Sequence, residues 1–230
     1  MAKIVVFANQ KGGVGKSTLA ILYANHLTGS DDPDGKGVLV VDTDVQRSIL
    51  AQRRDDMEQW GEDEMKYAVE YFKLTTMDEA EKMILDAKNK LEDTIVLVDV
   101  PGNITDDYIA PLLIYADYII CPYQYENKVL ESTTTFIKVL ESLRMKFPNK
   151  MVGQTIFVPN KIDSREGTKA DLEVQKKVDD IMSKYGIVTS KVPSRVDFTR
   201  INTYINTPKQ EQLVIPCFSD MDKHILSDAK

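Results

Sequence analysis

Cysteine and histidine are scarce in this chain, which contains two of each in 230 residues. Cys121 and Cys217 lie far apart and match no metal-ligand spacing, so the sequence argues against a disulfide framework and a cysteine metal site. We expect both to be small buried residues. Two histidines give no basis for a serine–histidine–acid hydrolase, and we expect His26 to be a surface or core residue rather than a ligand.

Long apolar runs are also missing. No stretch approaches the roughly 18 to 20 apolar residues of a membrane span, and the first apolar run is too short for a signal peptide. There is no internal repeat or low-complexity segment, and residues 31–35 predict a short surface turn. Because 43% of the residues are apolar, the chain can bury a core, and we predict a single cytoplasmic domain over residues 1–230.

What the chain does contain is a phosphate-binding loop (P-loop). Residues 9–18 read NQKGGVGKST, after an apolar run at 4–8 and before a helical pattern. Glycines let backbone N–H groups approach phosphate oxygens, and the dipole of the following helix favours anions. We expect a nucleotide here, with Lys16 on its β- and γ-phosphates and the Ser17 hydroxyl on Mg²⁺. The loop residues expected to contact it are Lys11, Gly12, Gly13, Val14, Gly15, Lys16, Ser17 and Thr18.

Strand and helix patterns alternate along the chain. We predict strands at 3–8, 37–42, 67–73, 94–99, 117–122, 151–158 and 187–192. We predict helices at 16–28, 46–58, 77–91, 105–115, 128–146, 168–184 and 198–206. Several strands are continuous apolar runs, as expected when helices cover both faces of a sheet. The pattern predicts an α/β fold of three layers, with a doubly wound, mostly parallel sheet and a site at the carboxyl ends of its strands.

Two predicted strands end in carboxylates. Asp42 and Asp44 close the second strand, and Asp99 closes the apolar run at 95–98 before Pro101-Gly102. Asp99 belongs to the third motif along the chain, after the P-loop and the Asp42–Asp44 pair. An acid at the end of an apolar strand in this position is typical of a Walker B strand that holds Mg²⁺, usually through water. For Asp42 and Asp44, a polar turn that ends the strand is the alternative.

Lys11 is the most specific feature of the P-loop. A strict P-loop has glycine where this chain has Gln10, whereas lysine directly before the glycines gives the deviant Walker A form. The chain therefore resembles the ParA/MinD superfamily of deviant Walker A ATPases from Lys3 to about Arg200, most closely the small ParA-type members of plasmids and mobile elements. The resemblance implies a P-loop ATPase that uses ATP and Mg²⁺ and has a weak activity that a partner stimulates.

The resemblance also implies residue roles. Lys11 would cross the interface of an ATP-bound homodimer to the partner's nucleotide, Asp42 would lie in the outer shell of the metal, and Asp44 would position the attacking water. The family has proline where this chain has Val45, which leaves the switch geometry after Asp44 open. The implied catalytic residues are Lys11, Lys16 and Asp44, and the implied metal residues are Ser17, Asp42 and Asp99.

A further motif, NKID at residues 160–163, follows a predicted strand. It matches the motif with which GTPases read guanine, whereas ParA-like proteins use an asparagine here to contact adenine. We favour adenine, with Asn160 as its contact, because Lys11 marks the ATP-using branch; guanine and an ordinary turn are the alternatives. Pro193 resembles the family residue that closes over the base.

Charge is unevenly distributed along the chain. Residues 1–127 carry a net charge of −11 and residues 128–209 carry +6, within a total of −7. A basic segment can dock on DNA phosphates, although such lysines are often only solvated helix faces. With the resemblance, it implies a switch that binds DNA non-specifically on the nucleoid and partitions plasmid, chromosome or mobile-element DNA with a ParB-like stimulating protein, without a membrane.

Two other functions compete with this interpretation. A MinD-like positioning ATPase on a membrane would need a basic amphipathic helix near the carboxyl end, and residues 218–228 instead carry three aspartates. An iron–sulfur reductase or a metabolic ligase of the superfamily is disfavoured by the missing cysteine pair and by Lys11, respectively.

Overall fold

The protein folds around a parallel β-sheet. The computed structural model describes residues 1–29, 37–103, 106–150, 153–163 and 167–227. The strands are β1 (Lys3–Phe7), β2 (Gly37–Asp42), β3 (Ala68–Tyr71), β4 (Thr94–Asp99), β5 (Tyr118–Tyr123), β6 (Gln154–Pro159) and β7 (Ile187–Val188). The helices are α1 (Lys16–Gly29), α2 (Ser48–Trp60), α3 (Met77–Lys90), α4 (Ile109–Ile114), α5 (Asn127–Lys146), α6 (Lys169–Met182) and α7 (Pro208–Ile225), with a 3₁₀ turn, η1 (Val196–Thr199).

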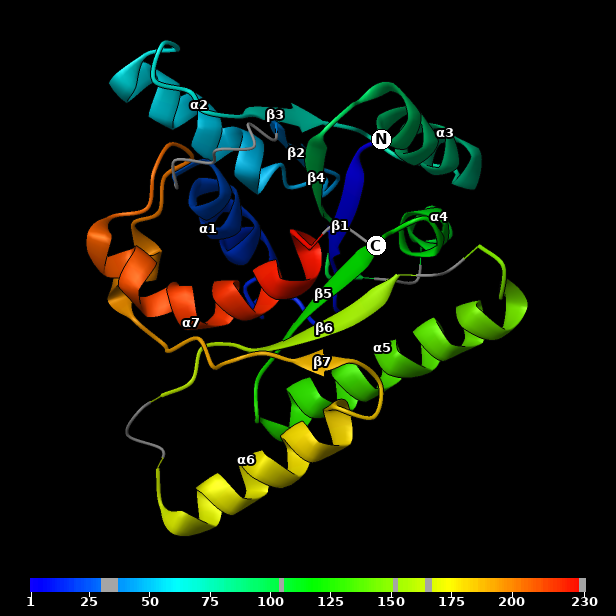
Figure 1. Cartoon of the computed structure of the whole chain (residues 1–230), viewed down its shortest axis with the longest axis vertical. Helices are drawn as coiled ribbons and strands as arrows, with labels where there is room; N and C mark the ends of the chain where they lie inside the picture. Colours follow the sequence, from blue (N-terminus) through cyan, green and yellow to red (C-terminus); the bar gives the residue numbers. More distant parts are fainter. Residues whose placement is uncertain (30–36, 104–105, 151–152, 164–166, 228–230) are drawn as a thin grey trace.

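The sheet has seven strands in the order β3-β2-β4-β1-β5-β6-β7, and every pair is parallel (Figure 1). β1, which leads into the P-loop, lies in the middle between β4 and β5. Since all the strands run the same way, the residues that follow β1, β2, β4 and β6 meet at one edge of the sheet. The predicted α/β fold class with a doubly wound parallel sheet is confirmed.

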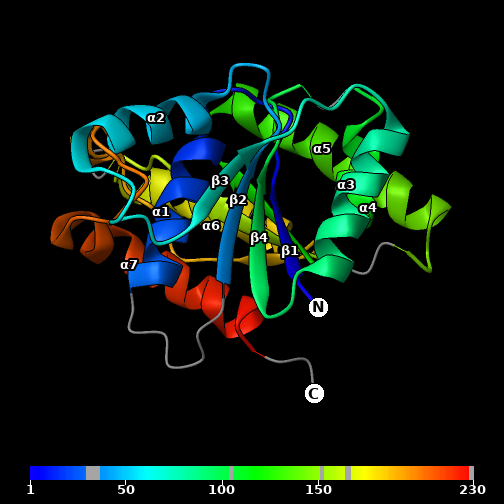
Figure 2. The same cartoon turned by 90° about the horizontal axis from the view of Figure 1, so that it is seen from above.

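Helices cover both faces of the sheet. Figure 2 shows α1, α2 and α7 on one side and α3, α4 and α5 on the other. Within β1, Ile4 and Val6 belong to the core beneath α3, α4 and α5, while Val5 and Phe7 belong to the core beneath α1 and α7. This alternation is the two-residue period of a strand buried on both faces. It fixes β1 rigidly behind the P-loop.

Element bounds agree with the prediction to within a few residues as far as α6, apart from a shorter helix in the region of α4. The predicted turn at 31–35 and the starts predicted at 105 and 151 lie outside the described residues. The strand predicted at 187–192 is shorter, because the Ser190 amide donates to Asp220 of α7 at 2.9 Å. No helix in the described ranges is long and apolar enough to cross a membrane.

The helix predicted at 198–206 is wrong. Asp56 of α2 holds this segment irregular by accepting hydrogen bonds from the amide and hydroxyl of Thr203, at 2.6 and 2.8 Å. The chain forms α7 at Pro208–Ile225 instead, a helix that we did not predict. Thr207 and Gln210 make a capping box, and Pro208 stands at the first helical position, where its missing N–H costs nothing.

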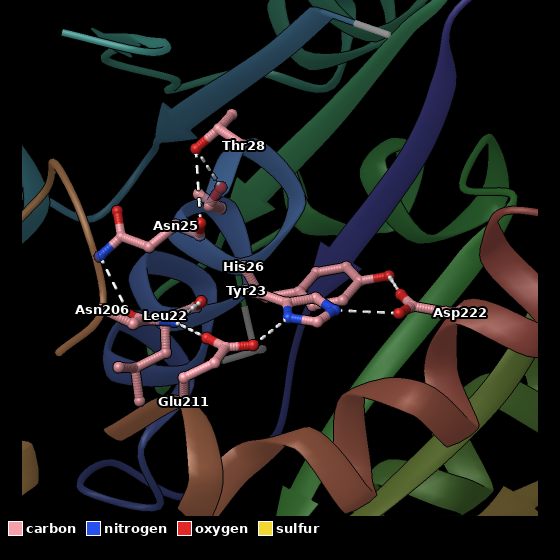
Figure 3. A network of polar contacts seen from close by, with 9 residues as sticks. Leu22, Tyr23, Asn25, His26, Thr28, Asn206, Glu211 and Asp222 are labelled. Carbon is pink, nitrogen blue, oxygen red and sulfur yellow. Dashed lines mark hydrogen bonds and ion pairs between the residues drawn. The ribbon is translucent and has the colours of Figure 1, made fainter. Parts of the chain in front are cut away.

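A half-buried histidine, His26, ties α7 to α1 (Figure 3). His26 lies between two carboxylates of α7: its Nδ1 contacts Glu211, and its Nε2 lies 2.9 Å from Asp222. The Tyr23 hydroxyl donates to Asp222 at 2.8 Å, and the Asn206 amide donates to Glu211 at 2.8 Å. Burial opposes the charged ring, but its hydrogen bonds to Asp222 and Glu211 prevail and raise the pKa of His26 to about 9. The two helices therefore share a cation at neutral pH.

Candidate nucleotide-binding site

The P-loop forms a wall of a cavity of about 560 Å³ at the carboxyl edge of the sheet. Gly13 and Gly15 have φ angles of 78° and 96°, a conformation that side chains rarely adopt. The cavity is lined by Gln10, Gly12, Gly13, Gly15, Lys16, Ser17, Thr18, Asp44, Gln46, Ser48, Gly102, Asn103 and Lys161. This polar lining suits a phosphate chain better than an apolar ligand.

The two P-loop lysines have different environments. Lys16 is buried, and its ammonium lies 3.4 Å from the carbonyl oxygen of Lys11. Burial lowers the pKa of Lys16, against the opposing effect of Asp99 and Asp44. Lys11 is exposed and does not line the cavity. Lys16 thus lies in the wall of the cavity, whereas Lys11 lies outside it on the protein surface.

Ser17 and Asp99 form the best candidate metal site. The Ser17 hydroxyl donates to Asp99 Oδ2 at 2.5 Å, while Asp99 Oδ1 is buried without a hydrogen-bond partner. Burial raises the pKa of Asp99 to about 7, despite the Ser17 hydrogen bond and the Lys16 charge. A buried carboxylate oxygen without a donor is expensive unless a cation or water satisfies it. These two residues therefore fit a bound Mg²⁺.

Asp42 caps α2. Its carboxylate is fully buried and accepts the amides of Asp44, Ile49 and Leu50 at 3.1, 3.1 and 3.2 Å. Burial raises the pKa of Asp42, and these hydrogen bonds oppose the rise. Asp44 lines the cavity two residues later and accepts the Gln46 amide at 2.9 Å. The first carboxylate thus fixes the turn that carries the second.

The chain after Asp44 departs from the family pattern in a defined way. Val45 is 71% exposed, and Arg47 adopts a left-handed conformation with φ of 52°. The Arg47 guanidinium lies 4.3 Å from the centre of the Tyr71 ring, a cation–π contact. The turn after Asp44, where the resemblance implies proline, is held here by the Asp42 cap and by the stacking of Arg47.

Gly102 brings the loop after β4 against the P-loop. A Cβ atom at this position would lie 2.9 Å from the Gly12 Cα and 3.0 Å from the Gly12 nitrogen, both backbone atoms. No side chain fits there without a shift of one loop. The Asp99-to-Gly102 segment and the P-loop are therefore in direct backbone contact.

The loop after β6 lies beside the P-loop. Asn160 is buried and its amide donates to the Val14 carbonyl at 2.8 Å. Ile162 forms a parallel bridge with Pro193, so the two segments predicted to surround the base are adjacent. Lys161 lines the cavity and was not predicted as a site residue, although its position directly after Asn160 could have suggested it.

The structure thus brings together every predicted P-loop residue, Asp44 and Asp99 at one edge, with Asn160 behind the loop.

The comparisons with known proteins agree on the fold. Sequence comparison with curated proteins gives no match. A plasmid partition protein of Borrelia burgdorferi bound to AMPPNP has a TM-score of 0.69 at 19% identity, covering 98% of this chain and 99% of that one.

Two other solved structures are similar. A McdA variant of Cyanothece in complex with ATP has a TM-score of 0.65 at 14% identity, covering 100% of this chain and 98% of that one. MinD of Pyrococcus horikoshii complexed with Mg-ADP has a TM-score of 0.67 at 17% identity, covering 97% of each chain. The family model described as the CobQ/CobB/MinD/ParA nucleotide binding domain matches residues 5–208. Because this match spans most of the chain, the chain belongs to that family, and the predicted ParA/MinD membership is confirmed.

Proposed function

We propose that the protein is an ATPase switch that dimerises on ATP, binds DNA non-specifically as a dimer, and partitions or positions plasmid, chromosome or mobile-element DNA. The observation that carries the proposal is the contrast between its two P-loop lysines. Lys16 lies in the wall of a cavity with a polar lining, while Lys11 is exposed beside it. A second subunit whose Lys11 reached this cavity would make the nucleotide part of the dimer interface.

The chemistry would be positioning and electrostatic stabilisation. Lys16 and the P-loop amides would hold the phosphates, Ser17 and Asp99 would hold Mg²⁺, and Asp44 would orient the attacking water. Mg²⁺, when bound, neutralises part of the phosphate charge. Asp42 would act from the outer shell by fixing the turn that carries Asp44, consistent with its three backbone hydrogen bonds.

ATP is the nucleotide we propose. Solved structures of the same fold contain AMPPNP, ATP and Mg-ADP, and Lys11 is the residue that distinguishes the ATP-using branch. In this proposal the adenine lies between the loops of Asn160 and Pro193, which the bridge at Ile162 holds together.

Non-specific DNA contact would come from the basic segment. Exposed lysines lie on α5, on α6 and just after the end of α6. These lysines are Lys138, Lys146, Lys169, Lys176, Lys177 and Lys184. Arg144 is a weaker candidate, because its guanidinium is bonded to Glu141, Thr155 and the Gly153 carbonyl. Only a dimer would place two such faces side by side, and a ParB-like protein would stimulate the hydrolysis that separates them.

A MinD-like action on a membrane is the second candidate, and α7 disfavours it. Most apolar residues of α7 are buried in the core that α1 and the sheet share, whereas Ile215 is 44% exposed. The buried ones are Val214, Cys217, Phe218, Met221 and Ile225. A membrane-binding helix needs a free apolar face with basic flanks.

DNA binding in the two nucleotide states tests the proposal. A fluorescent duplex of arbitrary sequence is titrated at several salt concentrations with ADP or a non-hydrolysable ATP analogue. We expect binding only with the analogue, falling steeply with salt. Lys11→Ala should remain a monomer by light scattering and lose DNA binding, whereas the control Lys90→Ala should behave as wild type. Equal binding in both states, or in neither, contradicts the coupling.

A further inference from the structure

Two side chains from the end of β6 donate to consecutive carbonyl groups of the P-loop. The Asn160 amide nitrogen lies 2.8 Å from the Val14 oxygen, and the Lys161 ammonium lies 2.6 Å from the Gly13 oxygen. Both contacts join segments that are almost 150 residues apart in the chain. Both donors bind carbonyl oxygens of the P-loop, whereas a bound phosphate is held by the backbone N–H groups of the P-loop.

The loop that supplies these donors is itself fixed. The backbone N–H of Asn160 donates to the Tyr123 carbonyl of β5 at 2.8 Å, and the backbone N–H of Ile162 donates to the Val192 carbonyl at 3.1 Å. Between them, Lys161 adopts φ of 58°, the left-handed conformation that residues other than glycine rarely take. Such a conformation persists when its surroundings determine it, and here it directs the lysine to the P-loop.

The consequence for the P-loop follows from peptide planarity. A carbonyl held on one side of the loop fixes the N–H of the next residue on the other side. Bonds to the carbonyls of Gly13 and Val14 therefore orient the amides of Val14 and Gly15. Gly15 also has to be glycine for this approach, since a Cβ there would lie 2.3 Å from the Asn160 amide nitrogen.

We propose that Asn160 and Lys161 are positioning residues for phosphate binding: they brace the P-loop so that its amides converge on the phosphate chain before any ligand arrives. The loop expected to read the base thus also sets affinity for the phosphates, whatever base they carry. This inference rests on the proposed nucleotide binding, and it goes beyond a base-contact role for Asn160.

Hydrogen exchange in the ligand-free protein tests the brace without any nucleotide. Amide exchange over residues 8–18 is followed by mass spectrometry in wild type, Asn160→Ala, Lys161→Ala and Lys161→Arg, with Lys82→Ala as a control that removes one exposed charge on α3. We expect about tenfold faster exchange in the two alanine variants, the loss corresponding to one hydrogen bond. Lys161→Arg, which keeps a donor, should restore slow exchange. Wild-type exchange in both alanine variants overturns the brace.

Binding separates bracing from base reading. Competition against a fluorescent nucleotide gives the affinities for ATP and for inorganic tripolyphosphate, which has no base. A brace predicts that Asn160→Ala lowers both affinities by a similar factor of about ten. A loss for ATP alone assigns Asn160 to the base and contradicts the inference. Absence of ATP binding in folded wild type would instead refute the proposed function, while the exchange experiment would still decide the brace. Lys161 is exposed, so its variants keep the test valid if Asn160→Ala does not fold.

Discussion

Alkaline pH should loosen the attachment of α7 to α1, because that attachment depends on a protonated His26. The pKa of His26 is about 9 in the folded protein and is near 6.5 in an unfolded chain. A group whose pKa is raised by folding stabilises the folded state fully below the unfolded pKa, and the contribution disappears as the pH rises through the folded pKa. Linkage gives about 2.5 kcal/mol at pH 7 and less than about 0.5 kcal/mol at pH 9, a loss of about 2 kcal/mol.

The groups around the His26 ring support a loss of stability as the pH rises. Glu211 and Asp222 face it from α7, and Tyr23 faces it from its own helix and donates to Asp222. Burial raises the pKa of Tyr23 well above its usual value, so the tyrosine stays neutral over this range. The pKa of Glu211 is lowered, because its hydrogen bonds to His26 and Asn206 outweigh burial. The ring therefore remains between carboxylates while it loses its proton.

Urea denaturation at pH 6, 7, 8 and 9 measures the effect in wild type and in His26→Gln. The wild type should lose about 2 kcal/mol more than the variant between pH 7 and 9, which for a chain of this size is a shift of about 4 to 8 °C in Tm. His224 lies near the end of α7 and does not contact Glu211 or Asp222 in the way that His26 does. It gives the matched control His224→Gln, in which stability should change with pH as in the wild type. Parallel pH curves for wild type and His26→Gln would refute the reasoning.

Three further predictions concern the candidate site. Asp44→Ala should retain nucleotide binding and lose a factor of about 10² to 10⁴ in phosphate release, and a wild-type rate would exclude it as the water-positioning residue. Gly102→Ala should weaken nucleotide binding about tenfold in a fluorescence titration, because its Cβ would lie 2.9 Å from the Gly12 Cα. Gly29→Ala is the control, because nothing lies within 4 Å of a Cβ at that position. Equal affinities of Gly102→Ala and wild type would mean that the loops separate freely. ATP should compete better than GTP for the site in the presence of Mg²⁺, and the reverse order would assign NKID to guanine.

The parts that could be predicted from sequence are those encoded locally. The run from Ile4 to Phe7 has no polar residue, which a strand buried on both faces requires, and both cores do receive it. Gly13 and Gly15 marked a loop with unusual φ angles, and the structure gives both positive values. These patterns depend on neighbours in the chain, so sequence was sufficient.

The prediction from sequence did not include α7, for a physical reason. Pro216 lies inside the helix and is locally unfavourable there, whereas the cap of Thr207 on Gln210 and the burial of Phe218 stabilise the helix. Burial against α1 is a tertiary effect that overrides local propensity. The Asp220 bond to Ser190 likewise ended β7 early, and nothing near Ser190 in the sequence indicated it.

The role of Asn160 shows where motif reading ends. The letters NKID correctly identified a loop beside the nucleotide cavity, since a strand end at this place in a parallel sheet must reach the same edge as the P-loop. They gave no sign that the donors of this loop would face the carbonyls of Gly13 and Val14, because that depends on the left-handed turn at Lys161 and on the missing side chain of Gly15. A motif specifies residue types at a spacing, and the atoms they bind are set by backbone geometry on both partners. The assignment of Asn160 therefore has to be made by comparing ligands with and without a base, and not by the motif.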